Sequence, residues 1–198
     1  MKAGCNIMIK AFAQEVCYFL HNLPEVKSCG LYGSVSTDSY DEYSDIDIEI
    51  DVSGVDNGWF ATQIPRILLK KFDVIFYDFA PSLAPNKYVV SLAMNNENPF
   101  MMVDVACTAT PHCDTVSKQQ LSSLNNLYDH TLKVFVANLK HFLRGVDCYD
   151  DISRMYGRIF RDREVYDEEQ MLNAVYEWLQ ENAEPRHEEY IALFEDYM

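Results

Sequence analysis

Residues 45–52 read Asp-Ile-Asp-Ile-Glu-Ile-Asp-Val, an unbroken alternation of acidic and aliphatic side chains. Because successive side chains of a β-strand point to opposite faces, this alternation predicts a strand with one buried face and one acidic face. Carboxylates two residues apart on one face repel each other unless a cation is held between them. The stretch therefore indicates either the solvated face of an edge strand or a site for Mg²⁺, an ion that prefers oxygen ligands.

A Gly-Ser pair stands shortly before this strand. Residues 26–32 are predicted to form a short strand that runs into Gly33-Ser34, and the polar loop 35–44 leads from there to Asp45. Glycine lets a backbone come close to a phosphate, and successive N–H groups with the Ser34 hydroxyl supply donors for its oxygens. Most Gly-Ser pairs are only turns, but this loop can bring phosphate donors and metal ligands to one corner of the sheet.

The run Leu31-Tyr32-Gly33-Ser34, a polar loop and then Ser44-Asp45-Ile46-Asp47-Ile48 resembles the Gly-Ser…Asp-x-Asp signature of the polymerase-β nucleotidyltransferase superfamily. The resemblance implies that Asp45 and Asp47 are catalytic residues and metal ligands. Gly33 and Ser34 are the implied nucleotide-binding residues. The implied substrate is a nucleoside triphosphate, with ATP expected, and the implied cofactor is Mg²⁺, with two ions.

The superfamily also uses a third acid on a later strand, flanked by apolar residues. Asp104, within the apolar run 100–106, fits this description as a catalytic residue and metal ligand, because an unpaired carboxylate in an apolar strand is costly. Asp78 is the rival third acid. The structural alternative for Asp104 is a pairing with a buried arginine or with backbone donors.

The remaining pattern predicts an α+β fold, with a small mixed β-sheet forming a nucleotidyltransferase domain and a C-terminal helical bundle after it. The expected domains are residues 1–115 and 116–198. Ser117 and Gln120 have the spacing of a capping box at the start of the helical half. The other expected elements are helices at 7–21, 59–71, 121–143, 149–161, 168–182 and 186–197, and strands at 72–79, 88–94 and 100–107.

The formal net charge of −15 argues against proteins that hold DNA or long RNA by their phosphates. We therefore expect a nucleoside triphosphate and a small-molecule acceptor as partners, and no bulk nucleic acid. The helical extension of about 80 residues resembles the layout of antibiotic (aminoglycoside- or lincosamide-type) nucleotidyltransferases. Together these features predict Mg²⁺-dependent transfer of a nucleoside monophosphate, expected to be AMP, to a hydroxyl of a small molecule. Nucleotidylation of a protein, and a non-catalytic nucleotide- or partner-binding protein of the same fold, are the alternatives.

One segment departs from the acidic balance. Residues 118–163 carry 8 basic and 5 acidic side chains, and Lys133 and Lys140 lie seven positions apart, on one stripe of a predicted helix. This stripe is expected to bind the phosphate tail of the nucleotide. The alternative is a solvated face that pairs with nearby acids.

No apolar stretch approaches the roughly 20 residues needed to span a membrane, and no N-terminal signal pattern is present. We expect a cytoplasmic protein without membrane partners. The six cysteines are scattered without Cys-x-x-Cys spacing, which favours reduced thiols over disulfides. Cys107, His112 and Cys113 lack a fourth ligand at a plausible spacing for zinc.

Overall fold

The computed structural model describes residues 2–80, 84, 86–112, 115–161 and 166–198, with side chains from residue 9 onward. The chain divides into two compact units, Met1–Asn125 and Asn126–Met198. Each unit is described by itself below. Among the described residues, no helix is long and apolar enough to cross a membrane.

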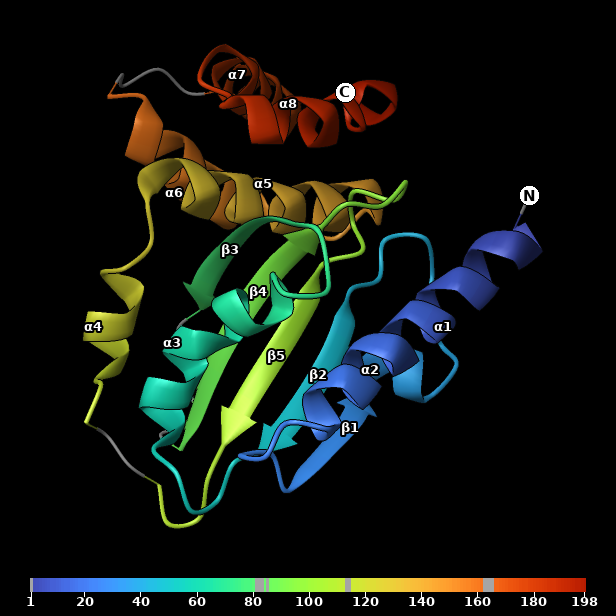
Figure 1. Ribbon diagram of the computed structural model, residues 1–198. Coiled ribbons are helices and arrows are strands. Elements are labelled where there is room, and N and C mark those ends of the chain that lie inside the picture. The colour runs from blue at the N-terminus through green and yellow to red at the C-terminus, as the bar shows by residue number, and fades with distance from the viewer. Residues whose placement is uncertain (1, 81–83, 85, 113–114, 162–165) are drawn as a thin grey trace. The chain divides into compact units, whose positions relative to one another are not determined.

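The first unit is built on a five-stranded sheet with the order β1-β2-β5-β4-β3 (Figure 1). β2 and β5 are parallel, whereas the other neighbouring pairs are antiparallel, so the sheet is mixed. The expected α+β class is therefore confirmed. The strands are β1 (Ser28–Tyr32), β2 (Ile46–Asp51), β3 (Val74–Ala80), β4 (Lys87–Met94) and β5 (Val103–Thr108).

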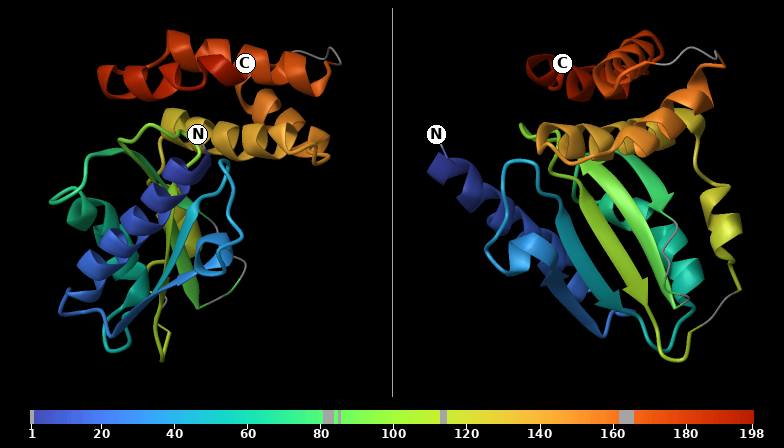
Figure 2. Two further views of the ribbon diagram at one scale, coloured as in Figure 1. Left: turned by 90° about the vertical axis from the view of Figure 1, so that its right-hand side faces the viewer. Right: turned by 180° about the vertical axis from the view of Figure 1, so that it is seen from behind.

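Helices α1 (Lys2–His21) and α3 (Asn57–Leu68) cover one face of this sheet (Figure 1). The aliphatic side chains of β2 are fully buried on that face, as the alternation predicted. Their partners in the core include Val16 and Leu20 of α1 and Phe60, Ile64 and Leu68 of α3. The opposite face, seen from behind in the right view of Figure 2, is the face to which the acidic side chains of β2 belong.

Two short helices complete the first unit, α2 (Gly33–Ser36) and α4 (Lys118–Ser122). The capping box of Ser117 and Gln120 is confirmed at the start of α4. The continuous helix expected over 121–143 is wrong, because the chain breaks between α4 and the next helix. Asn125 causes the break: its side chain accepts from Phe79 N at 2.7 Å and donates to Phe79 O at 3.0 Å.

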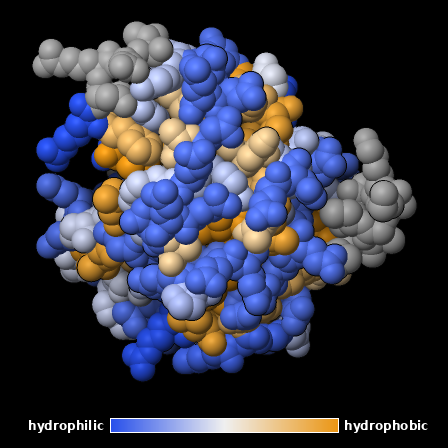
Figure 3. Space-filling model, turned by 90° about the horizontal axis from the view of Figure 1, so that it is seen from above, coloured by the Kyte–Doolittle hydropathy of each residue, from blue (hydrophilic) through white to orange (hydrophobic). Residues whose placement is uncertain are grey.

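The second unit contains α5 (Leu127–Leu143), α6 (Tyr149–Ile159), α7 (Glu168–Glu181), α8 (Pro185–Ala192) and a 3₁₀ turn at Glu195–Tyr197. Pro185 starts α8, as predicted. Buried apolar side chains join these helices: Leu132, Phe135, Leu139, Val175, Leu179 and Phe194. Seen from above, the molecule presents mainly hydrophilic residues with small separate apolar areas (Figure 3).

The units divide after Asn125, whereas the sequence predicted a domain boundary after residue 115. The segment between these positions belongs with the sheet, because Leu121 of α4 is part of the core of the first unit. The sequence pattern changes to helical at Ser117, but a change of pattern does not say on which core the first helix packs. The compact units are not by themselves domains, so the predicted domain boundary after residue 115 stays a prediction.

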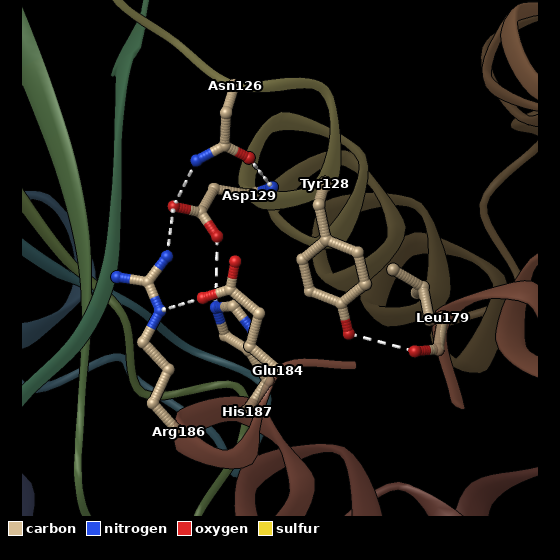
Figure 4. Close-up of polar contacts among 7 residues, drawn as sticks. All are labelled: Asn126, Tyr128, Asp129, Leu179, Glu184, Arg186 and His187. Carbon is tan, nitrogen blue, oxygen red and sulfur yellow. Dashed lines mark hydrogen bonds and ion pairs between the residues drawn. The ribbon is translucent and has the colours of Figure 1, made fainter. Parts of the chain in front are cut away.

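A buried acidic residue ties α8 to the start of α5 (Figure 4). Asp129 is 3 % exposed, and its Oδ1 lies 3.0 Å from Nε2 of His187, which is 1 % exposed. Its Oδ2 accepts from Asn126 Nδ2 at 2.7 Å and lies 3.4 Å from an Arg186 nitrogen. The ring of Tyr128 packs on His187 with 4.6 Å between centroids. The cluster therefore holds the first turns of two helices that are far apart in the sequence.

We expect Asp129→Ala to lower the free energy of unfolding by about 3 kcal/mol, because it leaves the buried His187 without its acidic partner. Chemical denaturation followed by circular dichroism measures this loss. Asp151→Ala is the control, since it removes an exposed pair with Arg154 and should cost ~0.5 kcal/mol. Equal losses in the two variants would show that the buried cluster does not stabilise the second unit.

Candidate active site

The acidic face of the sheet carries a row of polar residues that crosses the strands. Asp47 of β2 is paired with Asp104 of β5 in the parallel register, so the two carboxylates project from adjacent strands on the same face. The row continues from Asp104 to Ser91 of β4 and Asp78 of β3, and from Asp47 to Tyr32 of β1. The sheet therefore brings Asp47 and Asp104 together although they are far apart in the sequence.

The pKa of the Tyr32 phenol depends on the acidic side chains that lie near it at this end of the sheet. Burial raises the pKa of its phenol, and the negative charges of Asp47, Asp104, Glu49 and Asp45 raise it further. All four acids lie near enough to Tyr32 for their charges to act on it. Asp45 thus belongs to the same cluster, although it stands one residue before β2.

Gly33 lies directly against the carboxylate of Asp47. Its φ of +66° is in the left-handed region that favours glycine. A Cβ at this position would lie 3.0 Å from the Asp47 carboxyl carbon, and closer still to Oδ2. Val35, which is fully buried, anchors the turn that follows. The Gly-Ser pair and the acidic strand therefore meet at one corner, as the sequence analysis expected.

A hydrogen-bonded turn sets the entry of the chain into β2 at Asp45. The Ser44 hydroxyl donates to Asp41 Oδ1 at 2.8 Å and accepts from Asp41 N at 3.0 Å. Tyr43 N also donates to Asp41 Oδ1, at 3.0 Å. Ser44 is 4 % exposed, so the residue immediately before Asp45 is fixed in the protein interior.

The two later acids of β2 have partners within the protein. Glu49 lies 2.5 Å from Lys87 Nζ, which itself lies 5.5 Å from the centre of the Tyr32 ring. Asp51 accepts from the hydroxyl and the backbone N–H of Ser53, and these bonds lower the pKa of its carboxyl. Both acids therefore have structural partners further along the strand from Gly33. Asp47, which lies against Gly33, and Asp45, one residue before β2, are the metal-ligand candidates of this segment.

The donor set fits Mg²⁺ held jointly with a nucleotide. Within the described parts of the chain, no group of three or more His, Cys, Asp or Glu side chains is arranged to hold a metal ion by itself. Mg²⁺ seldom uses such cages, because it keeps several waters and binds one or two carboxylates plus substrate phosphates. Asp47 and Asp104 supply an adjacent pair of carboxylates, with Asp45 in the same cluster.

The other predicted residues lie on other elements. Asp78, the rival third acid, is fully buried and is separated from Asp104 by Ser91 of β4, so Asp104 is nearer to Asp47 than Asp78 is. Lys133 and Lys140 are on α5, in the second unit, and are half-buried on one side of that helix. Their expected contact with the nucleotide stays a prediction.

No protein-family model matches this chain, and no curated protein matches it. The solved structures to which the fold is similar include the following three. The polymerase core of TRAMP, an RNA surveillance complex, is 13% identical with a TM-score of 0.41 over 96% of this chain and 56% of that one. The Cid1 poly(U) polymerase with MgGTP bound is 11% identical with a TM-score of 0.42 over 87% and 49%. The GLD-2/RNP-8 complex is 12% identical with a TM-score of 0.41 over 91% and 52%.

This chain spans about half the length of these structures. The first two are polymerases, which agrees with the enzyme class that the sequence motif predicted. At these identities and TM-scores the superfamily itself stays a prediction from the motif. None of the three is an antibiotic nucleotidyltransferase, so the expected closeness to that branch has no support.

The expected partners need a correction. A small-molecule acceptor was expected and bulk nucleic acid was excluded, but the similar structures are RNA-processing polymerases, so this expectation is wrong. Net charge sums over the whole chain, so it does not describe the local surface that an acceptor would contact. Residues 118–163 are net basic within a chain of charge −15.

Proposed function

We propose that this chain is a Mg²⁺-dependent nucleotidyltransferase that transfers a nucleoside monophosphate from a nucleoside triphosphate to an acceptor hydroxyl. ATP is the expected donor, and pyrophosphate is released. One observation carries the proposal: Asp104 is the cross-strand partner of Asp47, and the Asp47 carboxylate lies against Gly33. A phosphate brought to Gly33-Ser34 would therefore stand beside two carboxylates that can share a metal ion.

The proposal gives each residue a role. Asp45, Asp47 and Asp104 would hold the Mg²⁺ ions, which would offset the charge on the triphosphate and on the departing pyrophosphate. Gly33 and Ser34 would position the phosphates through backbone N–H groups and the Ser34 hydroxyl. Asp104 would accept the proton of the acceptor hydroxyl as its oxygen attacks the α-phosphorus and the bond to pyrophosphate breaks. Lys133 and Lys140 are proposed to bind the phosphate tail.

Pyrophosphate release tests this function directly. The protein should release pyrophosphate from at least one of the four nucleoside triphosphates with Mg²⁺ and an acceptor, and not with chelator. Asp45→Asn should lower this rate by about a thousandfold, because it removes a metal ligand. Glu49→Gln is the matched control on the same strand and face, since Glu49 pairs with Lys87.

The acceptor is varied in the same assay. An RNA oligonucleotide with a free 3′-hydroxyl is compared with one whose 3′ end is blocked, because the similar structures include an RNA terminal U-transferase. A third reaction without oligonucleotide, analysed by mass spectrometry of the protein, tests transfer to a protein side chain. Binding of Mg²⁺-nucleotide without release of pyrophosphate from any nucleoside triphosphate, whichever acceptor is present, would mean a non-catalytic protein and would end the proposal.

A further inference from the structure

Two cysteines from different elements of the first unit are in contact. Cys17 lies on α1 and Cys29 on β1, twelve positions apart in the chain, and their Sγ atoms are 2.7 Å apart. Both are free thiols, and both are partly exposed. Cys29 of the edge strand β1 pairs with Ile50 of β2, so its side chain is on the apolar face of the sheet beneath α1. This face is opposite the one that carries the carboxylates of the candidate active site.

The pair opens onto a surface cavity of about 250 Å³. Gln14, Tyr18 and His21 of α1 and Leu31 of β1 line this cavity with the two cysteines. A small oxidant can therefore reach the sulfurs from solvent. The two other described free cysteines, Cys107 and Cys148, are buried.

We infer that Cys17 and Cys29 are a redox modification site that forms an intramolecular disulfide when the protein meets a peroxide or a disulfide oxidant. The sulfurs need to move together by well under 1 Å to reach the bond length of about 2.05 Å. A change of side-chain torsions is enough for this, since both elements are already packed together.

The chemistry balances with hydrogen peroxide as the oxidant. The Cys17 thiolate attacks one peroxide oxygen, which gives a sulfenic acid and releases hydroxide. The sulfur of Cys29 then attacks the Cys17 sulfur, forms the S–S bond and displaces the oxygen of the sulfenic acid, which leaves as water. The two thiol protons leave in two water molecules, so two thiols are oxidised and one peroxide is reduced.

Burial raises the pKa of the Cys29 thiol, and its hydrogen-bond contact with Cys17 raises it further. Cys29 is therefore a poor first nucleophile, and Cys17 is the residue that attacks the oxidant. Cys29 resolves the sulfenic acid because it lies within contact distance of it. The bond ties α1 to the edge strand β1 on the face away from the carboxylates, and so it stabilises the first unit.

Peptide mapping tests the inference, because trypsin cleaves after Lys27, between the two cysteines. The native protein is treated with hydrogen peroxide or oxidised glutathione, remaining thiols are alkylated, and the digest is analysed by mass spectrometry. We expect peptide 11–27 linked to peptide 28–66, with the link lost after dithiothreitol. The melting temperature of the first unit should be roughly 5–10 °C higher in the oxidised protein than in the reduced protein.

Cys17→Ser and Cys29→Ser should each abolish the linked peptide and the gain in melting temperature. Cys148→Ser, which changes a buried cysteine of the second unit, should leave both unchanged. The mapping of the unmutated protein decides the matter even if a variant does not fold. The inference would be overturned if the two peptides were recovered unlinked after oxidation. Each cysteine would then be alkylated, oxidised to sulfinic acid or bound to glutathione.

Discussion

Asp104→Asn is expected to lower turnover by about a thousandfold while the affinity for Mg²⁺-nucleotide changes by less than about fivefold. Asp104 faces Asp47 across two parallel strands. In the proposed site it would act on the metal and on the acceptor proton, whereas Asp45 and Asp47 would still hold the ion in the variant, so binding should persist. Pyrophosphate release at saturating nucleotide and calorimetric titration of the nucleotide measure the two quantities on the same preparation.

The structural alternative for Asp104 predicts a different result. If Asp104 only pairs with a buried partner, its replacement lowers the free energy of unfolding by about 3–5 kcal/mol and leaves turnover per folded molecule intact. Melting temperature is therefore measured on the same variant. That outcome would remove Asp104 from the site and promote Asp78, which lies in the same cross-strand row two strands away.

Gly33→Ala is expected to lower turnover by about a hundredfold, because a displacement of about 1 Å in a catalytic group can cost this much. The new Cβ would overlap the Asp47 carboxylate, so either the carboxylate or the turn must move. The substitution also places alanine at a φ of +66°, which costs roughly 1–2 kcal/mol. Initial rates at saturating Mg²⁺-nucleotide measure the effect.

Gly145→Ala separates the two consequences of the Gly33 substitution. Gly145 has a φ of +69°, close to that of Gly33, but nothing lies within 4 Å of the place where its Cβ would stand. It therefore reproduces the backbone strain without a clash. We expect a comparable loss of stability and an unchanged rate. Equal activity in the two variants would show that contact between Gly33 and Asp47 has no part in catalysis.

Several sequence predictions depended on local rules, and the structure bears them out. The alternation at 45–52 identified β2, its buried face and its acidic face before any strand pairing was known. The capping box at Ser117 and the proline at the start of α8 were correct because caps act within one helical turn. Gly33 was selected because glycine lets a backbone approach a phosphate. Its positive φ is one that favours glycine and its neighbour is the Asp47 carboxylate, whereas the approach to a phosphate stays a prediction.

The helix expected over 121–143 failed for a reason that local rules cannot supply. The apolar spacing continues through Asn125, but that side chain bonds to the backbone of Phe79, which lies 46 positions earlier. Similarly, Asp129 and His187 carry no recognisable motif, and the pairing of Cys17 with Cys29 lacks the spacing of a redox motif. Each depends on how separate elements pack.

The sequence by itself determined the acidic strand, the Gly-Ser turn before it and the mixed α+β character of the chain, because these follow from side-chain alternation and backbone preferences over a few residues. It could not choose between Asp78 and Asp104 on physical grounds, since both stand in apolar strands. Tertiary structure sets Asp104, and not Asp78, opposite Asp47, because β5 pairs in parallel with β2. Strand order and register depend on how all five strands and the helices over them share one core, and no local stretch of sequence contains that information.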